Sequence, residues 1–187
     1  PTQVPGSFSN VDGLINAGGT LAFVALPTGL TDRQVFTYNG ARFAQLTNVT
    51  PTDGTDFSPS ELTIFNGRIY FSARDHADGS YTSLVGVPAG QDRFLGRELW
   101  SVALAGGDAA WAANEGTPDD RPQPIFFFGF LIGTTPGTVT SSNPDQLEAS
   151  GNRLFFSAQG PSGRELYISS GGDGTLVDLA PGTAHSF

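Results

Sequence analysis

Apolar residues recur in a fixed order in three segments of the chain, 14–23, 62–71 and 147–156, which align without gaps. In each segment a leucine comes first, and two apolar residues follow it seven and nine positions later. Residues two apart on a strand point to the same face of a sheet. Between these positions lies a pair that tolerates the positive φ angles of a two-residue type I′ turn, so each segment predicts a β-hairpin. The pairs are Gly18-Gly19, Asn66-Gly67 and Gly151-Asn152.

A four-residue motif follows each hairpin, at 33–36, 97–100 and 164–167. It consists of an arginine, then Gln or Glu, then an aliphatic residue and finally an aromatic residue. It predicts a third strand, and a fourth is expected at 42–46, 109–113 and 175–179. Four consecutive strands per repeat are typical of a β-propeller blade. We therefore predict an all-β chain of β-propeller-type repeats, with three four-stranded antiparallel units. The units are residues 1–57, 58–140 and 141–187.

The repeating residues are predicted to be structural. The arginines of the motif are expected to bridge units through a carboxylate or a backbone carbonyl. The aromatic residues that close the motif are expected to pack between units. These residues are Arg33, Arg97, Arg164, Phe36, Trp100 and Tyr167.

Unit two is longer than the others because it carries two inserts, one centred on 75–92 and one between Trp100 and Pro136. Inserts in a repeat array emerge as loops on one face, which is often the binding face. The second insert contains the longest apolar run, 125–132, which predicts a buried strand. Its composition is aggregation-prone, so burial against another subunit is favoured over burial inside unit two. The aromatic residues of this expected contact are Phe126, Phe127, Phe128 and Phe130.

Several strings resemble the bacterial ELWxxDGT repeat family. Gly-Arg-Glu-Leu-Trp at 96–100 and Gly-Arg-Glu-Leu-Tyr at 163–167 follow Arg-Ile-Tyr-Phe-Ser-Ala and Arg-Leu-Phe-Phe-Ser-Ala. Unit three continues to Asp173-Gly-Thr, with two additional residues before it, whereas unit two lacks Asp-Gly-Thr. The resemblance implies an extracellular or surface propeller-like array, and it supplies no catalytic residues.

Composition narrows the classes of function. Among 187 residues there are 25 Gly, 13 Pro and only 14% charged residues, which disfavours helix bundles. The net charge of −9 argues against nucleic acid and anionic membranes as partners. Cysteine is absent, which excludes thiolate chemistry, and no apolar run is long enough for a membrane-inserted helix. A secreted or cell-surface location is expected, with the periplasm as an alternative.

One candidate metal site lies in the first insert, in the string Asp75-His-Ala-Asp78-Gly-Ser80, which combines two carboxylates with a glycine turn. These carboxylates could supply the hard oxygen ligands that Ca²⁺ prefers, and an Asx-stabilised turn explains the same residues. No cofactor other than calcium is expected. The only histidines, His76 and His185, belong to no recognisable catalytic motif, so we expect no enzyme.

Three aromatic residues, Tyr81, Phe94 and Trp111, lie outside the repeat pattern and predict an exposed contact surface. Three units cannot close a propeller of 4–8 blades, which favours self-association or a protein partner, over a longer array or a trefoil. The leading prediction is a non-enzymatic module for protein assembly or binding. The alternatives are a carbohydrate-binding module that stacks sugars on these aromatics, or a sialidase-like glycoside hydrolase.

Overall fold

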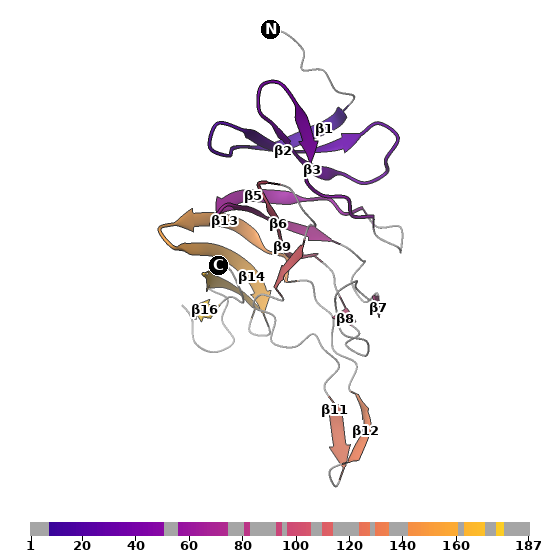
Figure 1. Ribbon diagram of the computed structural model, residues 1–187. Helices are drawn as coiled ribbons and strands as arrows, with labels where there is room; N and C mark the ends of the chain where they lie inside the picture. Colours follow the sequence, from indigo (N-terminus) through magenta and orange to yellow (C-terminus); the bar gives the residue numbers. More distant parts are fainter. Residues whose placement is uncertain are drawn as a thin grey trace.

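A computed structural model describes 8–50, 56–74, 97–105, 142–160 and 163–170, together with the short strands 81–82, 93–94, 110–113, 124–127, 130–134 and 175–177. These residues form β-strands, turns and irregular segments, and no helix occurs among them. The all-β prediction is therefore confirmed for the described part of the chain. Three antiparallel sheets dominate it and are stacked in chain order (Figure 1).

Each of the three larger sheets has four strands that pair in sequence order, so every sheet is an up-and-down meander. Sheet 1 contains β1 (Phe8–Asn16), β2 (Leu21–Pro27), β3 (Gln34–Tyr38) and β4 (Phe43–Gln45). Sheet 2 contains β5 (Ser60–Phe65), β6 (Arg68–Arg74), β9 (Arg97–Ala103) and β10 (Ala110–Ala113). Sheet 3 contains β13 (Asp145–Ser150), β14 (Arg153–Gly160), β15 (Gly163–Ser169) and β16 (Thr175–Val177).

These strands confirm the four predicted for each repeat. In the part of the chain that the structure describes, the sheets close into neither a barrel nor a complete propeller. The first strands of successive sheets are neighbours, since β1 lies against β5 and β5 lies against β13. The Thr63 hydroxyl donates to the Leu147 carbonyl at 2.8 Å and so joins β5 to β13.

The two inserts of unit two each contain a pair of antiparallel strands. The first pair is β7 (Tyr81–Thr82) with β8 (Arg93–Phe94), and the second is β11 (Pro124–Phe127) with β12 (Phe130–Thr134). The apolar run 125–132 was predicted as one buried strand, and that prediction is wrong because the run divides between β11 and β12. These two strands lie apart from the three stacked sheets (Figure 1).

Glycine-bearing pairs close the three hairpins, as predicted. Gly18 and Gly19 have φ angles of 66° and 88°, and Asn66 and Gly67 have 48° and 71°. Two positive values are the signature of a type I′ turn. The third hairpin differs, because Gly151 has a φ of 59° and Asn152 is not in the positive-φ region. That pattern belongs to a type II′ turn, which needs a positive φ only at its first central residue.

A β-bulge recurs in the first strand of every sheet, immediately before the opening leucine of the repeat. The residue at this position has a positive φ: 60° at Gly13, 57° at Glu61 and 56° at Gln146. The pairing register shifts around each of them. A bulge of this kind bends the strand and increases its twist. The three larger sheets therefore share a bend at the same position of their first strand.

Equivalent positions of the repeats lie on the same face of each sheet. We define the front face as the one carrying the aromatic residues Phe23 and Phe36 in sheet 1, and the opposite face as the back face. Phe71 and Trp100 are the front-face equivalents in sheet 2, and Phe156 and Tyr167 are those in sheet 3. Cross-strand pairing places the two members of each pair opposite one another.

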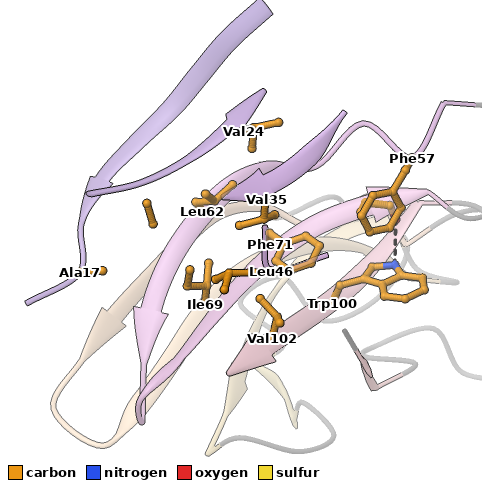
Figure 2. Close-up of a cluster of buried hydrophobic side chains, with 12 residues drawn as sticks. Ala17, Val24, Val35, Leu46, Phe57, Leu62, Ile69, Phe71, Trp100 and Val102 are labelled. Carbon is orange, nitrogen blue, oxygen red and sulfur yellow. Dashed lines mark hydrogen bonds between the residues drawn. The ribbon is translucent and has the colours of Figure 1, made fainter. Parts of the chain in front are cut away.

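The main core lies between the back face of sheet 1 and the front face of sheet 2 (Figure 2). Val24 and Val35 contribute from sheet 1, and Ile69, Phe71 and Trp100 contribute from sheet 2. A second core repeats the arrangement one sheet further along. Here the back face of sheet 2 meets the front face of sheet 3. The buried residues of this second core are Phe65, Tyr70, Leu99, Leu147, Leu154, Phe156, Ala158 and Tyr167.

Candidate functional site

The calcium candidates, Asp75 and Asp78, lie outside the described residues, so the site remains a prediction. Among the described residues, no three His, Asp or Glu side chains are grouped in a way that could hold a metal ion. Within that same part of the chain, no helix is long and apolar enough to cross a membrane.

The non-periodic aromatic residues occupy strands whose backbone pairing is described. Tyr81 and Phe94 are direct partners across β7 and β8. Trp111 lies on β10, the outer strand of sheet 2, directly opposite Trp100. The structure therefore brings Tyr81 and Phe94 together, although 12 residues separate them in the sequence. Trp111 belongs to a different sheet.

The phenylalanines of the second insert are also paired through their backbone. Phe127 faces Phe130 across β11 and β12, and Phe126 faces Leu131. Phe128 lies outside the described residues. The predicted contact is therefore carried by a two-stranded hairpin, and its role in binding remains a prediction.

The recurrent arginines hold the backbone that leads into the first strand of a sheet. Arg97 donates to the Ser58 carbonyl, and Arg164 donates to the Asn143 carbonyl, both at 3.0 Å. Both acceptors occupy equivalent positions with positive φ, 43° at Ser58 and 45° at Asn143. A guanidinium bound to the carbonyl stabilises this costly conformation. The structural interpretation of these arginines is confirmed, although Arg97 and Arg164 act within their own sheets rather than between sheets.

Arg33 does bridge two sheets. It donates to the Pro59 carbonyl at 3.2 Å, ahead of sheet 2, and forms an ion pair with Asp12 at 3.0 Å in its own sheet. Burial, followed by the charges of Arg74 and Arg33, lowers the pKa of Arg97 from its ordinary value. Asp56 acts in the opposite direction. Arg33 and Arg97 direct their guanidinium groups at backbone carbonyls, at serine hydroxyls and at the Asp12 carboxylate, which is a structural role.

The Gln or Glu of the motif reaches forward to the segment that leads into the next sheet. Buried Glu98 accepts hydrogen bonds from the backbone amide of Ser142, at 3.0 Å, and from its hydroxyl. Buried Gln34 does the same with its Oε1, which accepts from the Thr47 hydroxyl at 2.7 Å and from the Val49 amide at 3.2 Å. This role of Gln34 and Glu98 was not predicted from the sequence. The recurrence of an amide or carboxylate directly after the arginine was the available signal.

The front face of sheet 1 is the surface that sequence analysis did not identify. Phe23 and Phe36 are buried there under the rings of Phe8 and Phe43. Phe36 was predicted to pack between units, but it faces away from sheet 2. The neighbouring aliphatic residue Leu14 is 58% exposed. The front face of sheet 1 thus exposes aliphatic positions, Leu14 and Leu21, that its two equivalents bury.

No protein-family model, no curated protein and no solved structure matches this chain.

Proposed function

We propose that this chain is a non-enzymatic assembly module, built from propeller-type repeats, that binds protein through surfaces at the ends of its stack and in its unit-two inserts. One observation carries the proposal: sheets 2 and 3 each pack their front face against the back face of the preceding sheet. A regular stack of this kind leaves an apolar face at its first sheet, where Leu14 is exposed. Exposed apolar patches mark interaction surfaces.

The order of the strands supports the propeller-type interpretation. In a propeller, each blade is a four-stranded meander, and the blades surround a central channel. Here the first strands β1, β5 and β13 are neighbours, and the remaining strands follow in order away from them. Three consecutive blades would have this arrangement. The low charge content and the absence of cysteine and lysine support a secreted or cell-surface location.

The inserts provide the second proposed contact. Both interrupt unit two, and both bring aromatic residues into register, Tyr81 with Phe94 and Phe127 with Phe130. Aromatic residues dominate the binding energy of protein interfaces. The hairpin β11–β12 is therefore proposed to contact a protein surface.

A carbohydrate-binding module is the second candidate, favoured by the direct pairing of Tyr81 and Phe94 across β7 and β8. A glycan array separates the two functions. A protein-assembly module should give no selective glycan signal. A selective signal that is lost in a Tyr81→Ser, Phe94→Ser double variant would favour the carbohydrate function instead.

The assembly function is tested by the mass of the particle in solution, measured by light scattering over a range of protein concentrations. Phe127→Asp should lower the mass toward the monomer while the thermal melting temperature stays close to that of the wild type. Leu30→Asp, which changes an exposed residue in the turn between β2 and β3, is the matched control. A wild-type chain that stays monomeric at every concentration would contradict self-association. Unfolding of the Phe127 variant would place that segment in the core.

A further inference from the structure

The front face of sheet 1 has the same residue types as the front faces of sheets 2 and 3, but no preceding sheet covers it in the described part of the chain. Leu14 is 58% exposed, whereas its equivalents Leu62 and Leu147 are each 7% exposed. Leu21 repeats the difference at a second position. It is 37% exposed, whereas its equivalents Ile69 and Leu154 are fully buried. The same positions are therefore buried wherever another sheet precedes them.

The same kind of surface covers the equivalent positions in sheets 2 and 3. That surface is the back face of the preceding sheet. In sheet 1 its apolar residues come from β2 and β3, and in sheet 2 they come from β6 and β9. Val24 and Val35 are examples in sheet 1, and Tyr70 and Leu99 are examples in sheet 2. Sheet 3 has the same kind of back face, and its apolar residues remain partly exposed: Phe155, Leu166 and Ile168.

The two ends of the stack are thus complementary halves of an interface that the chain already forms twice. We propose that a second copy of this chain covers both: the front face of sheet 1 in each copy docks on the back face of sheet 3 in the other. The arrangement continues the established stacking without a new kind of contact. This inference rests on the proposed assembly function and names its surface and its partner.

The number of sheets favours a second copy as the occupant. A head-to-tail interface either closes into a ring or continues as an open filament. Closed propellers have 4–8 blades. Two copies of the three described sheets would supply six sheets and two identical interfaces, and six lies within this range.

The test uses the full chain and four variants, with particle mass measured by light scattering or sedimentation. The wild type should form a two-chain particle. Leu14→Asp and Ile168→Asp should each weaken self-association by more than about tenfold, because docking would bury an unpaired carboxylate. Leu30→Asp, an exposed leucine outside the face, should leave the dimer intact. Far-UV circular dichroism and thermal melting establish that each variant is folded, and Leu21→Asp repeats the test at a second position.

Mixing the variants tests the head-to-tail geometry. The Leu14→Asp chain keeps an intact sheet 3 face, and the Ile168→Asp chain keeps an intact sheet 1 face. A mixture of the two should therefore regain association through one unaltered interface, although neither chain associates alone. Mixing would not restore an interface formed by two copies of the same face.

Three results would overturn the proposal, and they separate it from the broader function. A monomeric wild type would refute the ring and self-association together. A dimer that is insensitive to Leu14→Asp and Ile168→Asp but is lost with Phe127→Asp would refute the ring and leave the assembly function standing. Folded Leu14 and Ile168 variants that fail to associate when mixed would refute the head-to-tail pairing.

Discussion

Sheets 1 and 2 contain the same aromatic arrangement in different surroundings. In sheet 1, the ring of Phe8 packs edge-on against Phe23, with centroids 6.0 Å apart and an interplanar angle of 81°. In sheet 2, Phe57 packs against Phe71 at 6.0 Å and 86°. Each sheet therefore builds its aromatic cluster from its own residues. The burial of the flanking aliphatic residues depends instead on the neighbouring sheet, so identical sequence signals give a core in one place and a surface in the other.

The largest effect should come from truncating equivalent aliphatic residues on the two front faces. Ile69→Ala should lower the free energy of unfolding by about 2–5 kcal/mol, because it leaves a cavity in a fully buried site. Leu21→Ala should cost less than about 1 kcal/mol in the monomer, because its side chain is already partly in water. Urea denaturation at low protein concentration measures both. Equal costs would mean that sheet 1 is covered within a single chain.

The forward-reaching polar side chains provide the next comparison. Glu98→Ala should cost about 1–3 kcal/mol, because the buried amide and hydroxyl of Ser142 lose their acceptor. Glu98→Gln keeps one acceptor oxygen, as Gln34 does in sheet 1, and should cost less. Denaturant unfolding of the two variants checks the order. If Glu98→Gln costs as much as Glu98→Ala, both carboxylate oxygens are needed, and the equivalence with Gln34 is wrong.

The residue at the recurrent bulge differs between the sheets: it is a glycine in sheet 1, a glutamate in sheet 2 and a glutamine in sheet 3. Gln146→Gly should raise the free energy of unfolding by roughly 0.5–1 kcal/mol, because glycine adopts the positive φ of 56° without steric cost. Gly13→Gln should lower it by a similar amount, since Gly13 has a φ of 60°. An added Cβ at Gly13 would make only ordinary contacts, 3.5 Å from Leu62 and Val24, so the effect reports conformation rather than crowding. Chemical denaturation detects both changes, and opposite signs are expected.

The smallest effect concerns alkaline pH. Burial, followed by the charge of Glu165, raises the pKa of Tyr167 above its ordinary value of 10.0. As pH rises, the Tyr167 hydroxyl therefore loses its proton in the unfolded chain before it does so in the folded chain. The contribution of this pKa difference to stability is complete below pH 10 and is lost as pH rises further. Tyr167→Phe should therefore show a shallower decline in melting temperature above pH 10 than the wild type. Parallel declines would show that Tyr167 contributes nothing to this pH dependence.

The regular strands were predictable because their signals are local. The glycine-bearing pairs mark the turns of Asn66-Gly67 and Gly18-Gly19, and the apolar positions two apart mark the strands that follow. The bulges were not predictable, because Glu61 and Gln146 are not residue types that signal a positive φ. The break in the run 125–132 had a signal in Gly129, within the run, but the continuous apolar pattern outweighed it.

The open front face of sheet 1 could not be predicted from its own residues. Leu14 and Leu21 have the same pattern as Leu62 and Ile69, and the difference in burial arises only when a preceding sheet is present or absent. The paired position of Tyr81 and Phe94 was equally hidden, since it depends on how residues 13 positions apart fold back on each other. Both surfaces are products of tertiary arrangement.

The sequential strand order also has a kinetic consequence. Most strand pairs of the three sheets join strands that are consecutive in the chain, so their contacts close short loops, which favours rapid folding. The pair β6–β9 is the exception, because the first insert of unit two separates its strands. Sheet 1 is complete at Gln45, but sheet 2 needs the chain as far as Ala103 before β9 can pair. At translation rates of about 5–20 residues per second, the back face of sheet 1, with Val24 and Val35, would stay exposed for roughly 3–12 s before β9 of sheet 2 has been synthesised. The first insert of unit two therefore lengthens the interval during which a nascent chain can be captured by a chaperone or by another nascent copy.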